Sequence, residues 1–191
     1  MTETAAKPRI APLERPYAPE TEAMLRKWMP PGTAIEPLAL FRTLAVHDDL
    51  FARMRPLGAG ILGHGRVERR EREIVIHRTC ARAGAEYEWG VHATVFAEAV
   101  GLTQEQLKAT VKGSAEDPAW SDGDRLLVRL CDELHDTCSV SGLLWSELAK
   151  RYSADQLLEL VIIWGWYRLI AGVVGAVGIE RELWAARFPA S

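Results

Sequence analysis

The sequence predicts an all-α protein. Apolar residues recur at intervals of three and four along most of the chain, which is the period of a helix with one buried face. Residues 103–106 and 153–156 have the residue pattern of capping boxes, which begin helices. No segment longer than a few residues shows the two-residue alternation that is typical of a half-buried strand. The length of 191 residues suits one domain, which we place at residues 20–191.

The first 19 residues contain four prolines and predict an extended N-terminal arm. Proline fixes φ and has no backbone N–H, so residues 1–19 are expected to wrap a partner subunit or to lie loosely. Residues 20–28 predict a short helix. Residues 38–62 predict either one helix with a break near residues 47–49 or two short helices.

The remaining helices are predicted from periodicity and from capping residues. Their expected ranges are 68–82, 87–100, a helix that begins at 103, 121–138, 143–152 and 155–170. The 68–82 helix interleaves Arg and Glu, which is typical of a solvated or interface face. The 155–170 helix is apolar nearly all round, so we expect it to be the central, buried helix.

Composition excludes several classes of function. The formal net charge is −3, so no overall field would attract nucleic acid or an anionic membrane. The apolar segment 157–179 is interrupted by Arg168 and by glycines, which favours a buried helix over a membrane span. Residues 1–15 lack the apolar stretch of a signal peptide, so we expect a cytoplasmic protein. Seven tryptophans favour a homo-oligomer, because large aromatic side chains dominate interfaces.

The three cysteines, Cys80, Cys131 and Cys138, form no C-x-x-C motif. An odd number of cysteines suggests a reducing compartment. Cys131 and Cys138 are expected on the apolar face of one helix, where seven residues rise about 10.5 Å. A disulfide needs its two Cα atoms within about 7 Å, so these two cysteines cannot pair if the helix reaches Cys138.

Two pairs of polar residues lie in otherwise apolar helical segments. Glu73 and His77 are four residues apart, and so are Glu88 and His92. Residues with this spacing share one face of a helix. Two consecutive helices joined at Gly84 tend to pack antiparallel, so the two pairs are expected to meet.

The residues around these pairs resemble the carboxymuconolactone decarboxylase family. The resemblance lies in Arg72-Glu73-Ile74-Val75-Ile76, in Glu86-Tyr87-Glu88-Trp89-x-x-His92 and in Gly101-Leu102-Thr103. It implies an all-helical fold of the alkylhydroperoxidase D type and obligate trimers or hexamers. We therefore expect a homo-oligomer, which is a dimer, trimer or hexamer. It also implies one of two activities: decarboxylation of a carboxy-lactone, or peroxide reduction by a C-x-x-C pair assisted by a Glu and a His.

Under this resemblance the family glutamate falls on Glu73 and the family histidine on His92. The two cysteine positions fall on Ala85 and Glu88, so both thiols are missing. Peroxide reduction of this kind needs a thiolate and a resolving thiol, which makes an antioxidant activity less favoured. His77 is a further departure, because the family usually has an apolar residue there.

We therefore predict an acid–base enzyme that acts on a small organic acid or lactone. His92 would carry the proton, Glu73 would orient its ring, and Glu88 would be a second carboxylate. His77, Tyr87 and Trp89 are weaker candidates that would line the substrate site.

Other readings stay open at this stage. His92 could be a satisfied core histidine, and Glu73 could belong to a solvated run of charges with its neighbouring arginines. Cys80 could act as a lone redox thiol. The two Glu-x-x-x-His pairs could bind a metal, although we expect neither a metal nor a cofactor. The chain could also be a non-catalytic oligomeric module that binds a small molecule.

Overall fold

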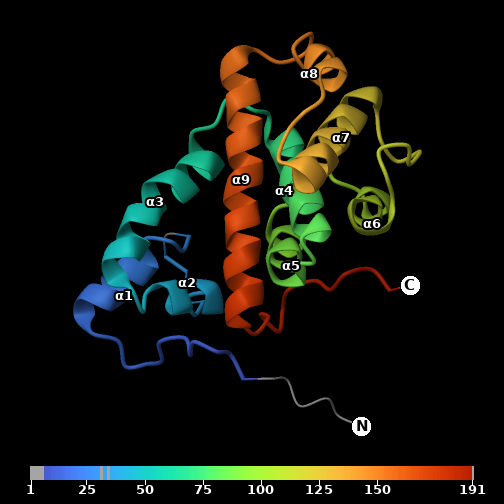
Figure 1. The fold of residues 1–191 in the computed structure, drawn as a ribbon. Helices are drawn as coiled ribbons and strands as arrows, with labels where there is room; N and C mark the ends of the chain where they lie inside the picture. The colour runs from blue at the N-terminus through green and yellow to red at the C-terminus, as the bar shows by residue number, and fades with distance from the viewer. Residues whose placement is uncertain (1–6, 31, 34, 191) are drawn as a thin grey trace. The chain divides into compact units, whose positions relative to one another are not determined.

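The computed structural model describes residues 7–30, 32–33 and 35–190, and the regular structure in these ranges is helical. The predicted all-α fold is therefore confirmed for the described chain (Figure 1). Its helices are α1 (Pro19–Arg26), α2 (Ala39–Leu44), α3 (Asp48–Gly63), α4 (Arg69–Arg82), α5 (Glu86–Val95), the 3₁₀ turn η1 (Glu98–Val100), α6 (Gln104–Lys112), α7 (Asp122–Thr137), α8 (Gly142–Leu148) and α9 (Ala154–Val177).

The chain divides into two compact units. The first contains residues up to His64 together with residues 173–183, and the second contains residues 65–172 together with the C-terminal segment from Trp184. The last residues of α9 thus belong to the first unit, and the rest of α9 belongs to the second. The predicted boundary between residues 19 and 20 stays a prediction.

The first unit has a small aromatic core. Phe51 and Leu25 are fully buried, and the ring of Trp28 stacks on that of Phe51 with centroids 5.0 Å apart. Residues 7–18 of the predicted arm are not helical, as expected. The arm is nevertheless not loose here, because Leu13 and Tyr17 pack against this core. Residues 1–6 lie outside the described part.

Local signals placed most helix boundaries correctly. Residues 38–62 form two helices, and the His47 side chain accepts a hydrogen bond from the backbone N–H of Leu50 at the start of α3. The capping box at Thr103 is present, and Ser121 begins α7 with a second one. The predicted helix 87–100 is interrupted, since α5 ends at Val95 and η1 follows. The predicted helix 143–152 ends early, at Leu148.

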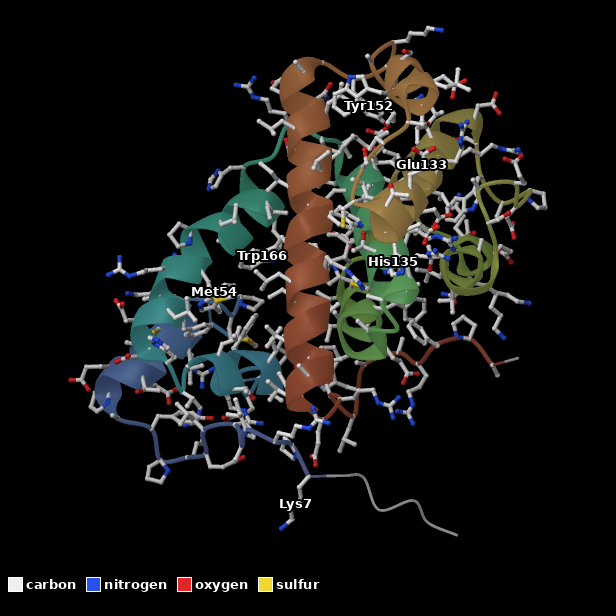
Figure 2. The ribbon with its side chains drawn as sticks, in the orientation of Figure 1. Lys7, Met54, Glu133, His135, Tyr152 and Trp166 are labelled. Atoms are coloured by element: carbon white, nitrogen blue, oxygen red, sulfur yellow. The ribbon has the colours of Figure 1, made fainter. Side chains whose placement is uncertain are left out.

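Helix α4 is the most buried helix of the second unit, which corrects our prediction of a solvated or interface face. Its ten residues from Glu71 to Cys80 are all buried. It packs against α5, α6 and α7 (Figure 1). The buried charged side chains of α4 have partners of opposite charge or hydrogen-bond donors: Glu71, for example, accepts hydrogen bonds from Arg151 and from Tyr152, which is labelled in Figure 2.

A ladder of ion pairs joins α4 to α7. Arg70 binds Asp124, Arg78 binds Asp132 and Arg82 binds Asp136, and each pair is separated by 54 residues. A constant separation means that the two helices run parallel. The two carboxylate oxygens of Asp132 accept hydrogen bonds from two nitrogen atoms of Arg78, at 2.7 and 2.8 Å. This bidentate arrangement is the strong form of the interaction.

Helix α9 is longer than the predicted helix 155–170. It is not buried all round, which corrects our expectation of a central, buried helix. One stripe, including Leu160, Ile163 and Tyr167, is buried. Leu158 and Leu169 on another face are exposed. By length and composition alone α9 could also cross a membrane, a test that core helices of soluble proteins pass too.

The cysteines differ from their predicted arrangement in one respect. Cys131 is buried on α7 with Leu127 and Leu134, as expected. Cys138 lies just beyond the helix end with a positive φ of 54° and is exposed. All three cysteines are free thiols.

Candidate active site

The candidate site is built on the hairpin of α4 and α5. The turn between them uses Gly84 at a φ of +67°, a left-handed conformation that glycine adopts without a steric penalty. The N–H of Ala85 then donates to the carbonyl of Cys80 at 2.9 Å, which is the closing bond of a Schellman motif. Helix α5 starts at the next residue, Glu86, and packs back along α4.

This packing brings Glu73 of α4 against His92 of α5. The Nδ1 of His92 lies 2.8 Å from Oε2 of Glu73. Glu73 is fully buried and His92 is 3% exposed. The readings in which Glu73 is solvated are therefore wrong, and the predicted meeting of the two polar pairs is observed.

Glu88 approaches His92 from the other side of the ring. Its Oε1 lies 3.6 Å from Nε2 of His92, a distance that allows an ion pair but is too long for a direct hydrogen bond. The imidazole thus stands between two carboxylates, and its Nε2 is held less tightly than its Nδ1. Glu88 and His92 lie on one face of α5 because they are four residues apart.

The electrostatics of the site favour a charged pair. Burial favours the neutral ring of His92, but the charge and hydrogen bond of Glu73 and the nearby Glu88 outweigh burial and raise the pKa of His92 to about 9. Burial likewise opposes ionisation of Glu73, yet the charge of His92 outweighs it and the pKa of Glu73 is lowered. At neutral pH the site therefore contains an imidazolium and a carboxylate.

His77 lies beside this pair in a different protonation state. Its Nδ1 is 2.7 Å from the backbone carbonyl oxygen of Glu73, and its ring is fully buried. Burial lowers the pKa of His77 to about 4, with the positive charge of His92 acting in the same direction and Glu73 opposing it. His77 is therefore neutral at neutral pH.

Aromatic rings enclose the two histidines. Trp89 meets the ring of His77 edge-on at 5.8 Å, and its indole N–H donates to the hydroxyl of Thr110 at 2.9 Å. Tyr167 of α9 meets the ring of His92 edge-on at 5.0 Å. Tyr87 is buried on α5.

The sequence reading did not identify Tyr167 or Phe188 as neighbours of the site. The ring of Phe188, in the C-terminal segment, packs on Trp89 with centroids 5.3 Å apart. Gly90 carried a usable signal, since a glycine inside a helix often marks a close approach of another backbone. A Cβ at Gly90 would indeed lie 2.1 Å from the carbonyl oxygen of Ala186.

The thiol chemistry of a peroxidase finds no support in the geometry. Ala85 and Glu88 occupy the two positions where the family resemblance places cysteines. Cys80 is fully buried, and burial, with the charges of Glu88 and Glu73, raises its pKa well above the usual value. A buried thiol with a raised pKa is a poor nucleophile. Among the described residues, no three His, Cys, Asp or Glu side chains are arranged to hold a metal ion.

Comparison with solved structures shows the fold. The chain is similar to an uncharacterized peroxidase-related protein from Silicibacter sp. TM1040, with a TM-score of 0.81, 11% identity, and coverage of 99% of this chain and 100% of the other. It is similar to a variant of the debrominase Bmp8 in complex with 2,3,4-tribromopyrrole, with a TM-score of 0.76, 16% identity and 94% coverage of both chains.

A third similar structure is a protein of unknown function from Agrobacterium tumefaciens, named as a candidate antioxidant defence protein AhpD. The TM-score is 0.67 and the identity 13%, and the alignment covers 73% of this chain and 96% of that one. No curated protein matches the sequence significantly.

The sequence also matches a family model. The match covers residues 48–122, from the start of α3 to the start of α7, and it includes Glu73, His77, Glu88 and His92. The resemblance seen in the sequence is thereby confirmed. Residues 48–122 of this chain match the model of the carboxymuconolactone decarboxylase family, and the chain has a helical fold of the alkylhydroperoxidase D type.

Proposed function

We propose that the protein is an acid–base enzyme that acts on a small organic acid or lactone, with decarboxylation or a related lyase or isomerase step as its reaction. The observation that carries this proposal is the buried His92 ring, bound to Glu73 at 2.8 Å and faced by Glu88 at 3.6 Å. A buried imidazolium with two carboxylate neighbours is a proton donor that holds its proton near neutral pH.

The two ring nitrogens of His92 have different tasks in this proposal. Nδ1–H stays bound to Glu73, which orients the ring and compensates its charge. Nε2–H lies beyond hydrogen-bond distance of Glu88 and is the proton that can be transferred. Glu88 compensates the charge on that side until transfer.

In a decarboxylation the bond between the carboxyl carbon and its neighbour breaks, and its electron pair stays on the neighbouring carbon as a carbanion or enolate. CO₂ leaves. His92 then gives its Nε2 proton to that carbon and becomes neutral, and a proton from solvent restores the imidazolium. Glu73 favours the charged ring before transfer and so sets the pKa of the donor.

A screen of carboxy-lactones and related acids in D₂O tests the proposal. Turnover should place one deuterium on the carbon that carried the carboxyl group. His92→Gln should lower kcat by about 10²- to 10⁴-fold, the range of a general acid. Glu73→Gln should lower it too and shift the pH profile, whereas Glu68→Gln, at the exposed start of the same helix, should not.

Two outcomes would count against the proposal. If His92→Gln retained full turnover of a true substrate, His92 would not be the proton donor. If no acid or lactone reacted, and a ligand still bound, the protein would be the non-catalytic binding module. Consumption of an organic hydroperoxide with a dithiol, abolished by Cys80→Ser, would support the antioxidant reading instead.

A further inference from the structure

Three buried acceptor atoms at the site have no hydrogen-bond partner among the described residues. They are Nε2 of His77, Oε2 of Glu88 and Oε1 of Glu73, of which the last lies 3.5 Å from Nε of Arg72. His77 is fully buried and Glu88 is 8% exposed. A buried polar atom without a partner is rare in native proteins, because it loses its bond to water and gains nothing in return. Because the unpaired Nε2 of His77 belongs to a ring next to that of His92, the proposed proton donor, it indicates a place where a ligand could bind.

The hydrogen bonds of His77 define what its Nε2 can do. A carbonyl oxygen can only accept, so the 2.7 Å contact with the Glu73 carbonyl requires the proton on Nδ1. The ring is neutral, since burial lowers the pKa of His77 to about 4. Nε2 therefore carries a lone pair and can accept a hydrogen bond, but it cannot donate one.

Two ring N–H groups near His77 are already used. The indole N–H of Trp89 binds Thr110 at 2.9 Å, and Nδ1–H of His92 binds Glu73 at 2.8 Å. The rings of Trp89 and His92 lie edge-on to the His77 ring at 5.8 and 6.2 Å. A ligand that brings its own O–H or N–H group to this place would satisfy Nε2 of His77.

We infer that His77 is a substrate-binding residue whose Nε2 accepts a hydrogen bond from an O–H or N–H group of the substrate, with Oε2 of Glu88 as a second acceptor. This inference rests on the proposed function and narrows its substrate class. The substrate is a small acid or lactone that also carries a hydroxyl or N–H donor. His77 selects such a molecule over an analogue without the donor, because the analogue leaves the acceptor unpaired.

Matched pairs of small compounds test this selection directly. Phenol and anisole differ by a methyl group on the donor atom, and so do pyrrolidinone and N-methylpyrrolidinone. The full chain is labelled with ¹⁵N in its histidine rings and titrated with each compound. In at least one pair the compound with the donor should bind about tenfold tighter or better and should shift the Nε2 resonance of His77.

Variants assign the preference to His77. His77→Phe keeps an aromatic ring without an acceptor and should remove the preference within a pair. His64→Phe, at an exposed position outside the candidate site, should retain the preference. The Nε2 shift in the unmodified protein gives the same answer without any variant, so the test does not depend on the stability of His77→Phe.

The outcomes separate this inference from the proposed function. No preference in either pair, whether both compounds bind or neither does, would overturn the role of His77, and so would a preference that survives His77→Phe. His92→Gln should lower turnover by the factor given above and leave the preference intact. A preference together with turnover that does not depend on His92 would keep the binding role and reject the acid–base chemistry.

Discussion

At the scale of single residues, the site combines two histidines in opposite charge states. His92 is held as a cation by Glu73, whereas the neighbouring His77 is neutral. The two rings are 6.2 Å apart, so a second positive charge on His77 would be disfavoured by burial and by His92 together. The opposite states suit the two proposed tasks, in which one ring would donate a proton and the other would accept a hydrogen bond.

The stability of the protein should depend on pH through both histidines. Below its unfolded value of 6.5, His77 takes up a proton in the unfolded chain but not in the fold, so stability should decrease by about 2 kcal/mol from pH 6.5 to about pH 5. Above 6.5 the unfolded chain loses the His92 proton that the fold retains, so stability should decrease by roughly 3 kcal/mol as the pH rises to about 9.

Urea unfolding as a function of pH measures both limbs. His77→Phe should flatten the acid limb and leave the alkaline limb. His92→Gln should remove the alkaline limb. Since the pKa of Glu73 is lowered, its own contribution is lost only at lower pH, as the pH falls below the usual carboxyl range. An acid limb unchanged in His77→Phe would contradict this assignment.

At the scale of elements, α4 is buried because its arginines are paired with α7. Arg78 contacts both oxygens of Asp132 and also donates to the backbone carbonyls of Thr110 and Gly113, at 2.9 and 3.0 Å. Its side chain is 5% exposed. It therefore joins α4 to α7 and to the end of α6, and its loss would leave buried acceptors unpaired.

Arg78→Ala should destabilise the protein by about 3–5 kcal/mol, the usual effect of breaking a buried ion pair. Arg53→Ala is the matched control, because Arg53 pairs with Asp49 on the surface of α3 with its side chain 75% exposed. The control should cost about 0.5 kcal/mol or less. Chemical unfolding gives both values, and similar effects of the two changes would contradict the role assigned to the ladder.

The C-terminal segment is held on α5 at a glycine. The N–H of Ala186 donates to the hydroxyl of Thr94 and that of Phe188 to the carboxylate of Glu86, both at 2.9 Å. Between these bonds the backbone passes over Gly90, where no side chain fits. Residues 184–190 thereby cover the helix that carries Glu88 and His92.

Gly90→Ala should release this segment from α5, because its Cβ would lie 2.1 Å from a backbone oxygen. Limited digestion with a carboxypeptidase should then remove the C-terminal residues faster than in the unmodified chain. Gly165→Ala, in α9 with nothing within 4 Å of the added Cβ, should leave the rate unchanged and could stabilise its helix by up to about 1 kcal/mol. Equal rates for all three proteins would show that the segment does not depend on Gly90.

At the scale of the whole molecule, α9 leaves an apolar face uncovered. Leu158, Ile162 and Leu169 are 62%, 40% and 48% exposed and share one side of the helix. Exposed apolar side chains that gather on one face are typical of an interface. This observation supports the predicted homo-oligomer, which stays a proposal.

Light scattering after size exclusion should give a mass that is a multiple of the chain mass of 21.3 kDa. Leu158→Glu should shift the mass towards that of one chain, because it places a charge in the proposed interface. Leu183→Glu, at a fully exposed position outside α9, should have no effect. A single-chain mass for the unmodified protein would reject the oligomer.

The sequence by itself determined the helical class, most helix boundaries and the pairing of α4 with α5. Capping boxes and helix-ending glycines act within one turn of the chain, so Thr103, Ser121 and Gly84 could be interpreted without any distant contact. The spacing of Glu73, His77, Glu88 and His92 likewise determined which side chains share a face.

Only the tertiary structure decided which helix is buried and which atoms remain unpaired. Arg78 is buried because it pairs with Asp132, which is 54 residues away in the sequence. No local sequence pattern predicts such a partner. The free lone pair of His77 follows from a bond to the Glu73 carbonyl, and Phe188 reaches Trp89 only through the path of the C-terminal segment. The free energy of a buried polar group depends on the partners that the fold brings to it, and these partners are distant in sequence.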